Sequence, residues 1–112
     1  MRRLCRLAEL GDPGSARLDL PEHPYGYSLC LVHLDGQVHG YLNSCPHTDS
    51  PMDWQPGRFL TPDGRYIQCS LHGAMFEVDG GRCVAGPCRG DRLTPVFVYV
   101  EDGIVYLGET FD

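Results

Sequence analysis

Residues 28–42 read SLCLVHLDGQVHGYL, and this stretch decides the fold class. The apolar run over 28–33 predicts a β-strand, and the Asp35-Gly36 pair that follows is typical of the two-residue turn of a β-hairpin. The run over 38–42 then returns as the second strand. Apolar or aromatic residues also flank three further Asp-Gly pairs, which begin at Asp63, Asp79 and Asp102. The sequence therefore predicts an all-β fold, a meander arranged as a barrel or a sandwich.

The rest of the chain shows similar short apolar or alternating runs. We expect further strands over 3–10, 16–20, 66–69, 75–78, 96–101 and 104–107. The stretch 44–62 is different, because it is rich in Pro, Asp and Gly and shows no regular alternation. A long loop inside a compact domain is usually functional, so we expect the functional site to begin there.

Length and charge limit what this chain can do. A chain of 112 residues is the usual size of one domain, so we expect residues 1–112 to form a single domain without a second catalytic one. The net charge is −6, and the nine Lys and Arg residues are scattered along the chain. Nucleic acid is therefore not expected as a partner, since phosphate binding depends on clustered basic residues. An acidic surface suits docking onto a basic patch of another protein, although many proteins are mildly acidic for solubility alone.

The N-terminal sequence and the cysteine count indicate a compartment. The basic N-terminal residues are not followed by an apolar segment, because Glu9, Asp12 and Pro13 break the run, and this argues against a signal peptide. No apolar stretch is long enough to cross a membrane. We therefore expect a cytoplasmic protein, in which six cysteines indicate metal binding or redox chemistry before disulfides.

Two short motifs combine cysteine with histidine. Cys45-Pro46-His47 opens the long loop, and Cys69 is followed three residues later by His72, at the end of a predicted strand. Thiolates suit iron bound to sulfide, and neutral imidazole in place of two thiolates makes such a centre easier to reduce. The pattern predicts one [2Fe–2S] cluster held by Cys45, His47, Cys69 and His72, both as cofactor ligands and as metal ligands.

Two other interpretations of these residues remain open. A set of two cysteines and two histidines can hold a structural zinc ion in an interaction domain, although zinc modules usually pair like ligands. A catalytic Cys–His pair is the other alternative, but no Ser, Asp or Asn is placed to orient the histidine. We expect no catalytic residues and no enzymatic activity of the chain's own.

The chain resembles the single-domain Rieske-type ferredoxins that serve as components of aromatic-ring oxygenase systems. The resemblance lies in the two ligand motifs, the segment Gly73-Ala74-Met75-Phe76, the turn Asp79-Gly80-Gly81 and the pair Gly86-Pro87. It implies the Rieske fold, with stacked antiparallel sheets and a two-loop cluster-binding subdomain at about 43–89. Gly86-Pro87 matches a third loop that covers the cluster in this family. One departure is a longer connection between His47 and Cys69, whose extra residues we expect to extend a hairpin at 59–64.

The resemblance also implies a function and partners. It implies a one-electron carrier between a ferredoxin reductase and a terminal oxygenase or other oxidoreductase, monomeric when free. A small subunit of a stable oxidoreductase complex is the alternative. High-potential relatives carry a disulfide between the cluster loops and two hydroxyl donors near the cluster. The matching positions here hold residues that supply neither, which predicts a low reduction potential: Ser50, Leu71, Ala74 and Phe76.

The remaining cysteines and histidines are not expected to bind the cluster. Cys83 and Cys88 could form a local disulfide or a redox-sensing pair, but in a cytosolic protein we expect them to be reduced thiols near the cluster loop. Cys5 and Cys30 lie on predicted strands and are expected to be small buried apolar residues. Three histidines outside the motifs are expected at the surface, namely His23, His33 and His39.

Overall fold

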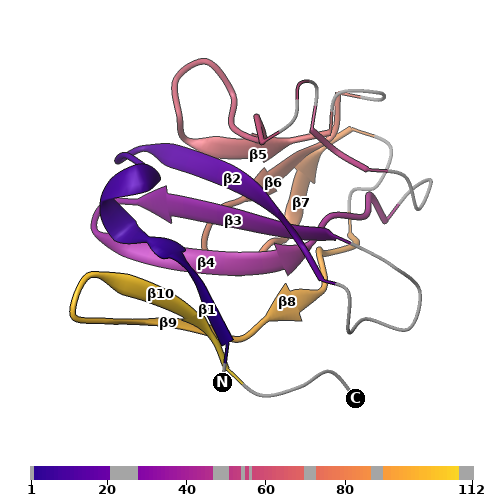
Figure 1. The fold of residues 1–112 in the computed structure, drawn as a ribbon. Helices are drawn as coiled ribbons and strands as arrows, with labels where there is room; N and C mark the ends of the chain where they lie inside the picture. Colours follow the sequence, from indigo (N-terminus) through magenta and orange to yellow (C-terminus); the bar gives the residue numbers. More distant parts are fainter. Residues whose placement is uncertain are drawn as a thin grey trace.

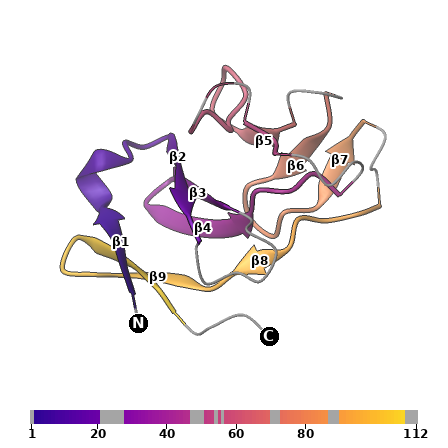
Figure 2. The same ribbon diagram turned by 45° about the vertical axis from the view of Figure 1, so that its right-hand side comes forward.

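In a computed structural model, the described part of the chain forms three antiparallel sheets. The structure describes residues 2–20, 28–46, 51–53, 55, 57–69, 73–86 and 90–108. The sheets have the strand orders β1-β10-β9, β2-β3-β4-β8 and β5-β6-β7. The four-stranded sheet lies between the two three-stranded ones, as Figures 1 and 2 show from two directions. The predicted all-β class with stacked antiparallel sheets is therefore confirmed.

The central sheet is built around the hairpin that the sequence predicted. Strand β3 spans Ser28–Leu34 and pairs with β4, Gln37–Leu42, on one side and with β2, Gly14–Asp19, on the other. Asp35 and Gly36 both have positive φ, 53° and 80°, as the tight turn of a twisted hairpin requires. The expected strand 16–20 thus begins two residues earlier, because its pairing with β3 continues to His33.

The second sheet joins the two ends of the described chain. Strand β1, Arg2–Arg6, pairs with β10, Ile104–Leu107, which pairs with β9, Val98–Glu101. The expected strand 3–10 was too long, because a 3₁₀ helix over Leu7–Glu9 follows β1. The side chain of Glu9 accepts a hydrogen bond from Arg6 N at 2.8 Å, and this contact tightens the chain into the helical turn.

The expected strand over 96–101 is split between two sheets. Strand β8, Pro95–Val96, pairs with β4, whereas β9 begins at Val98 and pairs with β10. Phe97 lies at the crossover and is 63% exposed. The alternation of apolar residues continues across the break, so the sequence pattern alone could not reveal it.

The third sheet lies in the part of the chain where a cluster-binding subdomain was predicted. It contains β5, Tyr66–Gln68, β6, Met75–Glu77, and β7, Cys83–Ala85. Strand β7 was not predicted, because its three residues stand between glycine-rich turns. An antiparallel bridge joins Leu60 to Ile67, so the residues before β5 extend a hairpin as expected. The boundaries 43–89 stay a prediction.

Strand β3 contributes to two separate cores because both of its faces are buried. Cys30 and Val32 point into the core under the β5-β6-β7 sheet, and Leu29 and Leu31 point into the core against the β1-β10-β9 sheet. Burial on both faces explains why the strand reads as a continuous apolar run rather than an alternating one. The core under β5-β6-β7 also contains both cysteines of the predicted ligand set, Cys45 and Cys69.

Candidate metal centre

The first predicted ligand loop leaves the central sheet at the end of β4. Backbone hydrogen bonds from Asn43 N to Ser28 O, 2.9 Å, and from Ser44 N to Leu42 O, 2.8 Å, fix the chain just before Cys45. The side chain of Cys45 is fully buried. His47 lies outside the described residues, so its role as a ligand stays a prediction.

The second predicted ligand loop connects β5 with β6. Cys69 N donates to Ala74 O at 2.8 Å, and Gly73 N donates to Cys69 O at 3.1 Å. These bonds join the two ends of the loop, and Gly73 has the positive φ, 67°, that favours glycine. Cys69 is fully buried, and His72 lies outside the described residues.

The two cysteines belong to one apolar cluster of buried side chains. Fully buried neighbours in this cluster come from several elements: Met52, Phe59, Ala74 and Phe76. Cys45 and Cys69 thus lie in the same buried, water-excluding core, although 23 residues separate them in sequence. The structure places the two predicted sulfur ligands in one buried cluster, and the two predicted nitrogen ligands lie outside the described residues.

A glycine of the predicted third loop packs directly onto the second ligand loop. Gly86 has φ +94°, and a Cβ placed on it would lie only 2.7 Å from Cα of Ala74. Ala74 is itself fully buried and accepts the hydrogen bond from Cys69 N. Only a residue without a side chain allows this approach. Pro87 and Cys88 lie outside the described residues.

Two polar residues that the sequence analysis did not single out stand at the base of the first loop. Asn43 is 2% exposed, and its amide contacts Ser28, Met52 and Asp53. Burial by itself would raise the pKa of Asp53, but hydrogen bonds from Gly57 N and Asn43 hold that pKa below its usual value. In the sequence, the only indication of this role was an amide residue between a predicted strand and Cys45. That indication is weak without knowledge of the tertiary contacts.

The other cysteines only partly match the expectations. Cys30 is fully buried as expected, and burial together with the nearby Asp53 charge raises the pKa of its thiol well above the usual value. Cys5 is only partly buried, which corrects the expectation for that residue. Cys83 is buried, and its Sγ donates to Ala85 O at 3.2 Å.

The prediction of a surface histidine is wrong for His33. Its side chain is buried beneath the turn that precedes β2, and Nδ1 lies 2.6 Å from Gly11 O. Nε2 lies 3.7 Å from Asp12 Oδ2. His33 is buried because this turn folds over the end of β3, a contact between separate segments. His39 is partly buried, and His23 lies outside the described residues.

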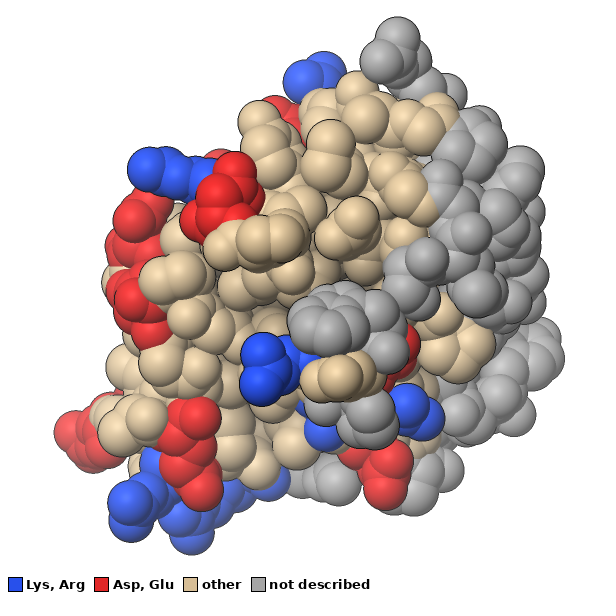
Figure 3. Space-filling view, turned by 90° about the horizontal axis from the view of Figure 1, so that it is seen from above, with Lys and Arg blue, Asp and Glu red and all other residues tan. Residues whose placement is uncertain are grey.

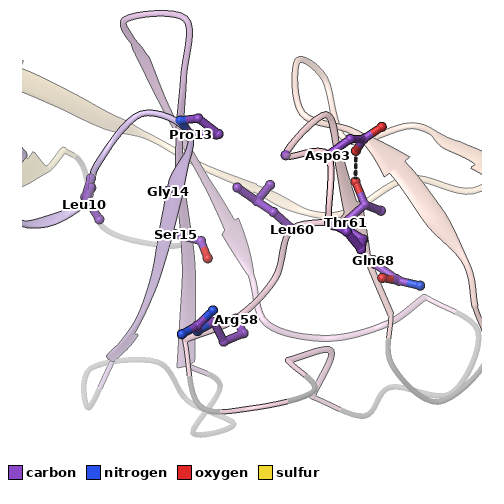
Figure 4. A pocket seen from close by; sticks show the side chains of 11 residues that line it. Leu10, Pro13, Gly14, Ser15, Arg58, Leu60, Thr61, Asp63 and Gln68 are labelled. Atoms are coloured by element: carbon purple, nitrogen blue, oxygen red, sulfur yellow. Dashed lines mark hydrogen bonds between the residues drawn. The ribbon is translucent and has the colours of Figure 1, made fainter.

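An open cavity of about 710 Å³ is lined by the turn before β2 on one side and by the hairpin at 58–68 on the other. Figure 4 shows Leu60 between the two walls, with Arg58 at one end and Asp63 on the far wall, where Asp63 accepts a hydrogen bond from Thr61. Neither Cys45 nor Cys69 lines this cavity. It is therefore separate from the sulfur ligands of the candidate metal centre.

The charge on the upper face of the molecule is uneven. Figure 3 shows a wide uncharged area there, with acidic groups gathered toward the left end. In Figure 1 this end carries the turns at Asp35-Gly36 and Asp102-Gly103 and the 3₁₀ helix. Exposed acidic residues occur in or next to these segments, namely Glu9, Asp12, Asp35 and Asp102.

In the described part of the chain, no group of three or more His, Cys, Asp or Glu side chains gathers in a metal-binding arrangement, and that part excludes both predicted histidine ligands. Among the same described residues, no helix has the length and apolar character needed to span a membrane.

Comparison with known proteins identifies the family. The Rieske [2Fe-2S] domain model matches residues 3–101. The ferredoxin component of a naphthalene 1,2-dioxygenase system from Pseudomonas aeruginosa is 34% identical over 62 residues, which cover 55% of each chain. The ferredoxin component of a 2,4-dinitrotoluene dioxygenase system from Burkholderia sp. (strain RASC) is 32% identical over 65 residues, 58% of each chain. The matched part is thus little more than half the length of these curated relatives.

A solved structure extends the likeness to the whole fold. The ferredoxin of Sphingomonas yanoikuyae B1 superposes with a TM-score of 0.75 at 27% identity, covering 96% of this chain and 97% of that chain. The domain model implies one Rieske-type [2Fe–2S] cluster as the cofactor. The described residues fit this group, because two thiols, Cys45 and Cys69, lie fully buried in one apolar cluster, each at the start of one of the two predicted ligand loops. The chain belongs to the Rieske [2Fe–2S] domain family.

Proposed function

We propose that this protein is a one-electron carrier of a multicomponent oxygenase system, with Cys45, His47, Cys69 and His72 as the cluster ligands. The observation that carries the proposal is the burial of Cys45 and Cys69 in one apolar cluster, inside a chain whose matched domain is Rieske [2Fe–2S]. When bound, the cluster supplies a site that accepts and gives up one electron. In this proposal, electron transfer is the only reaction in which the protein takes part, and the chain has no enzymatic activity of its own.

The protein residues have distinct tasks in this proposal. Cys45 and Cys69 supply the thiolates from the inner side, where packed side chains exclude water. His47 and His72 supply neutral nitrogen donors, which lower the negative charge of the centre compared with four thiolates. Ala74 and Phe76, both fully buried, offer no side-chain hydrogen-bond donor. We therefore propose a potential toward the low end of the Rieske range of roughly −150 to +300 mV.

The partners in this proposal are a reductase and a terminal oxygenase. Support comes from the curated relatives, which are named as ferredoxin components of dioxygenase systems. The net charge of −6 would favour encounter with basic docking surfaces. We place the carrier in the cytoplasm, as a monomer that visits its partners in turn.

The first experiment measures the visible absorption spectrum of anaerobically purified protein, with iron, sulfide and zinc assayed on the same sample. We expect a red-brown protein with about two irons and two sulfides per chain. Cys45→Ser and His72→Ala should lose the colour, while His39→Ala, a partly buried histidine outside the motifs, should keep it. A colourless protein with one zinc would refute the proposal and favour the structural-metal interpretation.

The second experiment tests the carrier role separately from the cofactor. Cluster-loaded protein is reduced by a ferredoxin reductase of a dioxygenase system and then mixed with the matching oxygenase, and the absorbance of each component is followed. Reduction followed by reoxidation within turnover time supports the carrier. Purification from the native source only as part of a large complex would instead favour the alternative, a subunit of a stable oxidoreductase.

A further inference from the structure

The side chain of Asn43 links three separate parts of the chain at the point where the first ligand loop begins. Its Nδ2 donates to Ser28 Oγ at 3.0 Å and to Asp53 Oδ1 at 3.1 Å. Its Oδ1 accepts a hydrogen bond from Met52 N at 2.8 Å. Both hydrogens of the amide are thus used, and the oxygen holds a backbone group nine residues further along the chain.

The partner of this amide is a nearly buried carboxylate. The side chain of Asp53 is 3% exposed, and its second oxygen accepts from Gly57 N at 3.1 Å and from Arg17 Nη1 at 3.4 Å. A buried carboxylate is costly unless hydrogen bonds and a nearby cation compensate its charge. Asp53 has both, so the loop is attached to strand β2 through Arg17 and to the residue that follows β4, Asn43.

We propose that Asn43 and Asp53 form a positioning pair for the cluster ligands of the first loop. The pair closes the segment 43–53 at its base, and both predicted ligands of that loop, Cys45 and His47, belong to the enclosed segment. Cys45 stands only two residues from Asn43, so a shift of the anchor moves the sulfur ligand directly. The proposal rests on the proposed function, because it takes the ligand set from there.

A positioning role differs from a general contribution to stability. Groups that hold metal ligands in place change the affinity for the metal by about 10- to 100-fold when they are mutated. A group that only stabilises the fold lowers the unfolding temperature but leaves the reduction potential and the spectrum of the loaded protein unchanged. The two roles therefore separate when cluster release and potential are measured on folded protein.

The chemistry of the pair provides a sharp set of variants. Asn43→Asp places two carboxylates face to face, and Asp53→Asn removes the charge that Arg17 and Gly57 N contact. In the double variant N43D/D53N, the new carboxylate accepts from Met52 N and the new amide donates to it. The double variant therefore restores a matched donor and acceptor with the same number of atoms, which the single variants do not.

Two controls accompany these variants. Asp63→Asn alters another hydrogen-bonded carboxylate, one that accepts from Thr61 in the hairpin away from the first loop. Val105→Ala removes two methyl groups from the core between β10 and the central sheet, and so lowers fold stability at a distance from the candidate metal centre. Both controls are expected to keep the wild-type potential.

The experiment measures the rate at which loaded protein loses its visible absorbance in excess iron chelator, together with the reduction potential and the electron paramagnetic resonance spectrum of the reduced protein. All samples are kept below their unfolding temperatures. We expect each single variant to lose the cluster about 10- to 100-fold faster than wild type, with a shifted potential, and N43D/D53N to return to within about threefold. Asp63→Asn and Val105→Ala should stay within about twofold of wild type.

The outcomes distinguish this proposal from the proposed function. A wild-type protein that holds no [2Fe–2S] cluster would overturn both. If wild type holds the cluster and the single variants release it at the wild-type rate, the positioning pair is refuted while the carrier stands. Should a single variant fail to fold, the double variant decides, because recovery of colour and potential supports the pair and continued loss overturns it.

Discussion

The contact between Gly86 and Ala74 gives a prediction whose size follows from the structure. Replacing Gly86 with Ala adds one methyl group that would lie 2.7 Å from Cα and 3.2 Å from Cβ of Ala74. Gly80 is a matched control, since it has the same φ, +94°, and nothing within 4 Å of the added carbon. Both changes carry the cost of an L-residue at positive φ, and only Gly86→Ala adds the steric overlap.

The two effects can be separated as free energies of unfolding. Positive φ costs an alanine about 1–2 kcal/mol, partly offset by about 0.4–1 kcal/mol from a stiffer unfolded chain, so Gly80→Ala should destabilise by about 1 kcal/mol. Overpacking against backbone adds about 1–3 kcal/mol, which brings Gly86→Ala to about 2–4 kcal/mol. At about 4 °C per kcal/mol, the unfolding midpoints should fall by about 4 °C and about 8–16 °C.

The assay is thermal unfolding under anaerobic conditions, followed by circular dichroism and by visible absorbance of the loaded protein. Loss of the visible band in Gly86→Ala should precede or coincide with loss of β structure, because the overlap falls on the loop that begins at Cys69. Equal midpoints for the two glycine variants would show that the close approach to Ala74 has no energetic weight. The packing of the third loop on Ala74 would then not require a glycine at position 86.

Three further predictions concern single side chains. Tyr41→Phe removes the buried hydrogen bond from the Tyr41 hydroxyl to Val78 O, 2.6 Å. It should lower the free energy of unfolding, measured in urea, by about 1–2 kcal/mol. Tyr66→Phe, at an exposed tyrosine, should lower it little. Because the pKa of Asp53 is lowered in the folded state, its contribution is present above the unfolded pKa of about 3.9 and is lost as pH falls through the folded value. The stability difference between wild type and Asp53→Asn should therefore narrow from pH 7 to pH 3, and a constant difference would contradict this. Cys30, whose pKa burial raises, should resist iodoacetamide at pH 8 until the protein unfolds, as mass spectrometry of labelled peptides can show.

Local signals were enough to predict most of the strands and to single out Cys45 and Cys69, the two cysteines that the structure places in one buried cluster. The pairs at Asp35 and Asp102 adopt the positive φ values that a two-residue turn needs, 53° and 52°, so the hairpins could be derived from the residues alone. Cys45 and Cys69 could be singled out as candidate ligands because each follows a predicted strand and precedes a histidine by two or three residues. Such features depend on neighbours in sequence, which is why a single chain reveals them.

Features that depend on contacts between distant segments could not be predicted. The break at Phe97 depends on which sheet each half of the run joins, and the alternation of residues is the same in either case. The burial of His33 depends on a turn more than 20 residues earlier in the chain. Asn43 and Asp53 are common polar residues, and only the folded structure shows the hydrogen bond between their side chains.

The long connection between Cys45 and Cys69 also affects whether copies of the protein can associate through their sheets. Strand β2 is one of the two edge strands of the central sheet, and such an edge can recruit a strand from another molecule. Here Ser15 Oγ donates to Gly57 O at 2.6 Å and accepts from Phe59 N at 3.3 Å, and Gly64 packs so closely on Pro13 that a Cβ would lie 2.6 Å from Cγ. A second copy of the chain would have to displace these contacts before it could add a strand along the start of β2. The connection therefore disfavours self-association at this edge of the sheet.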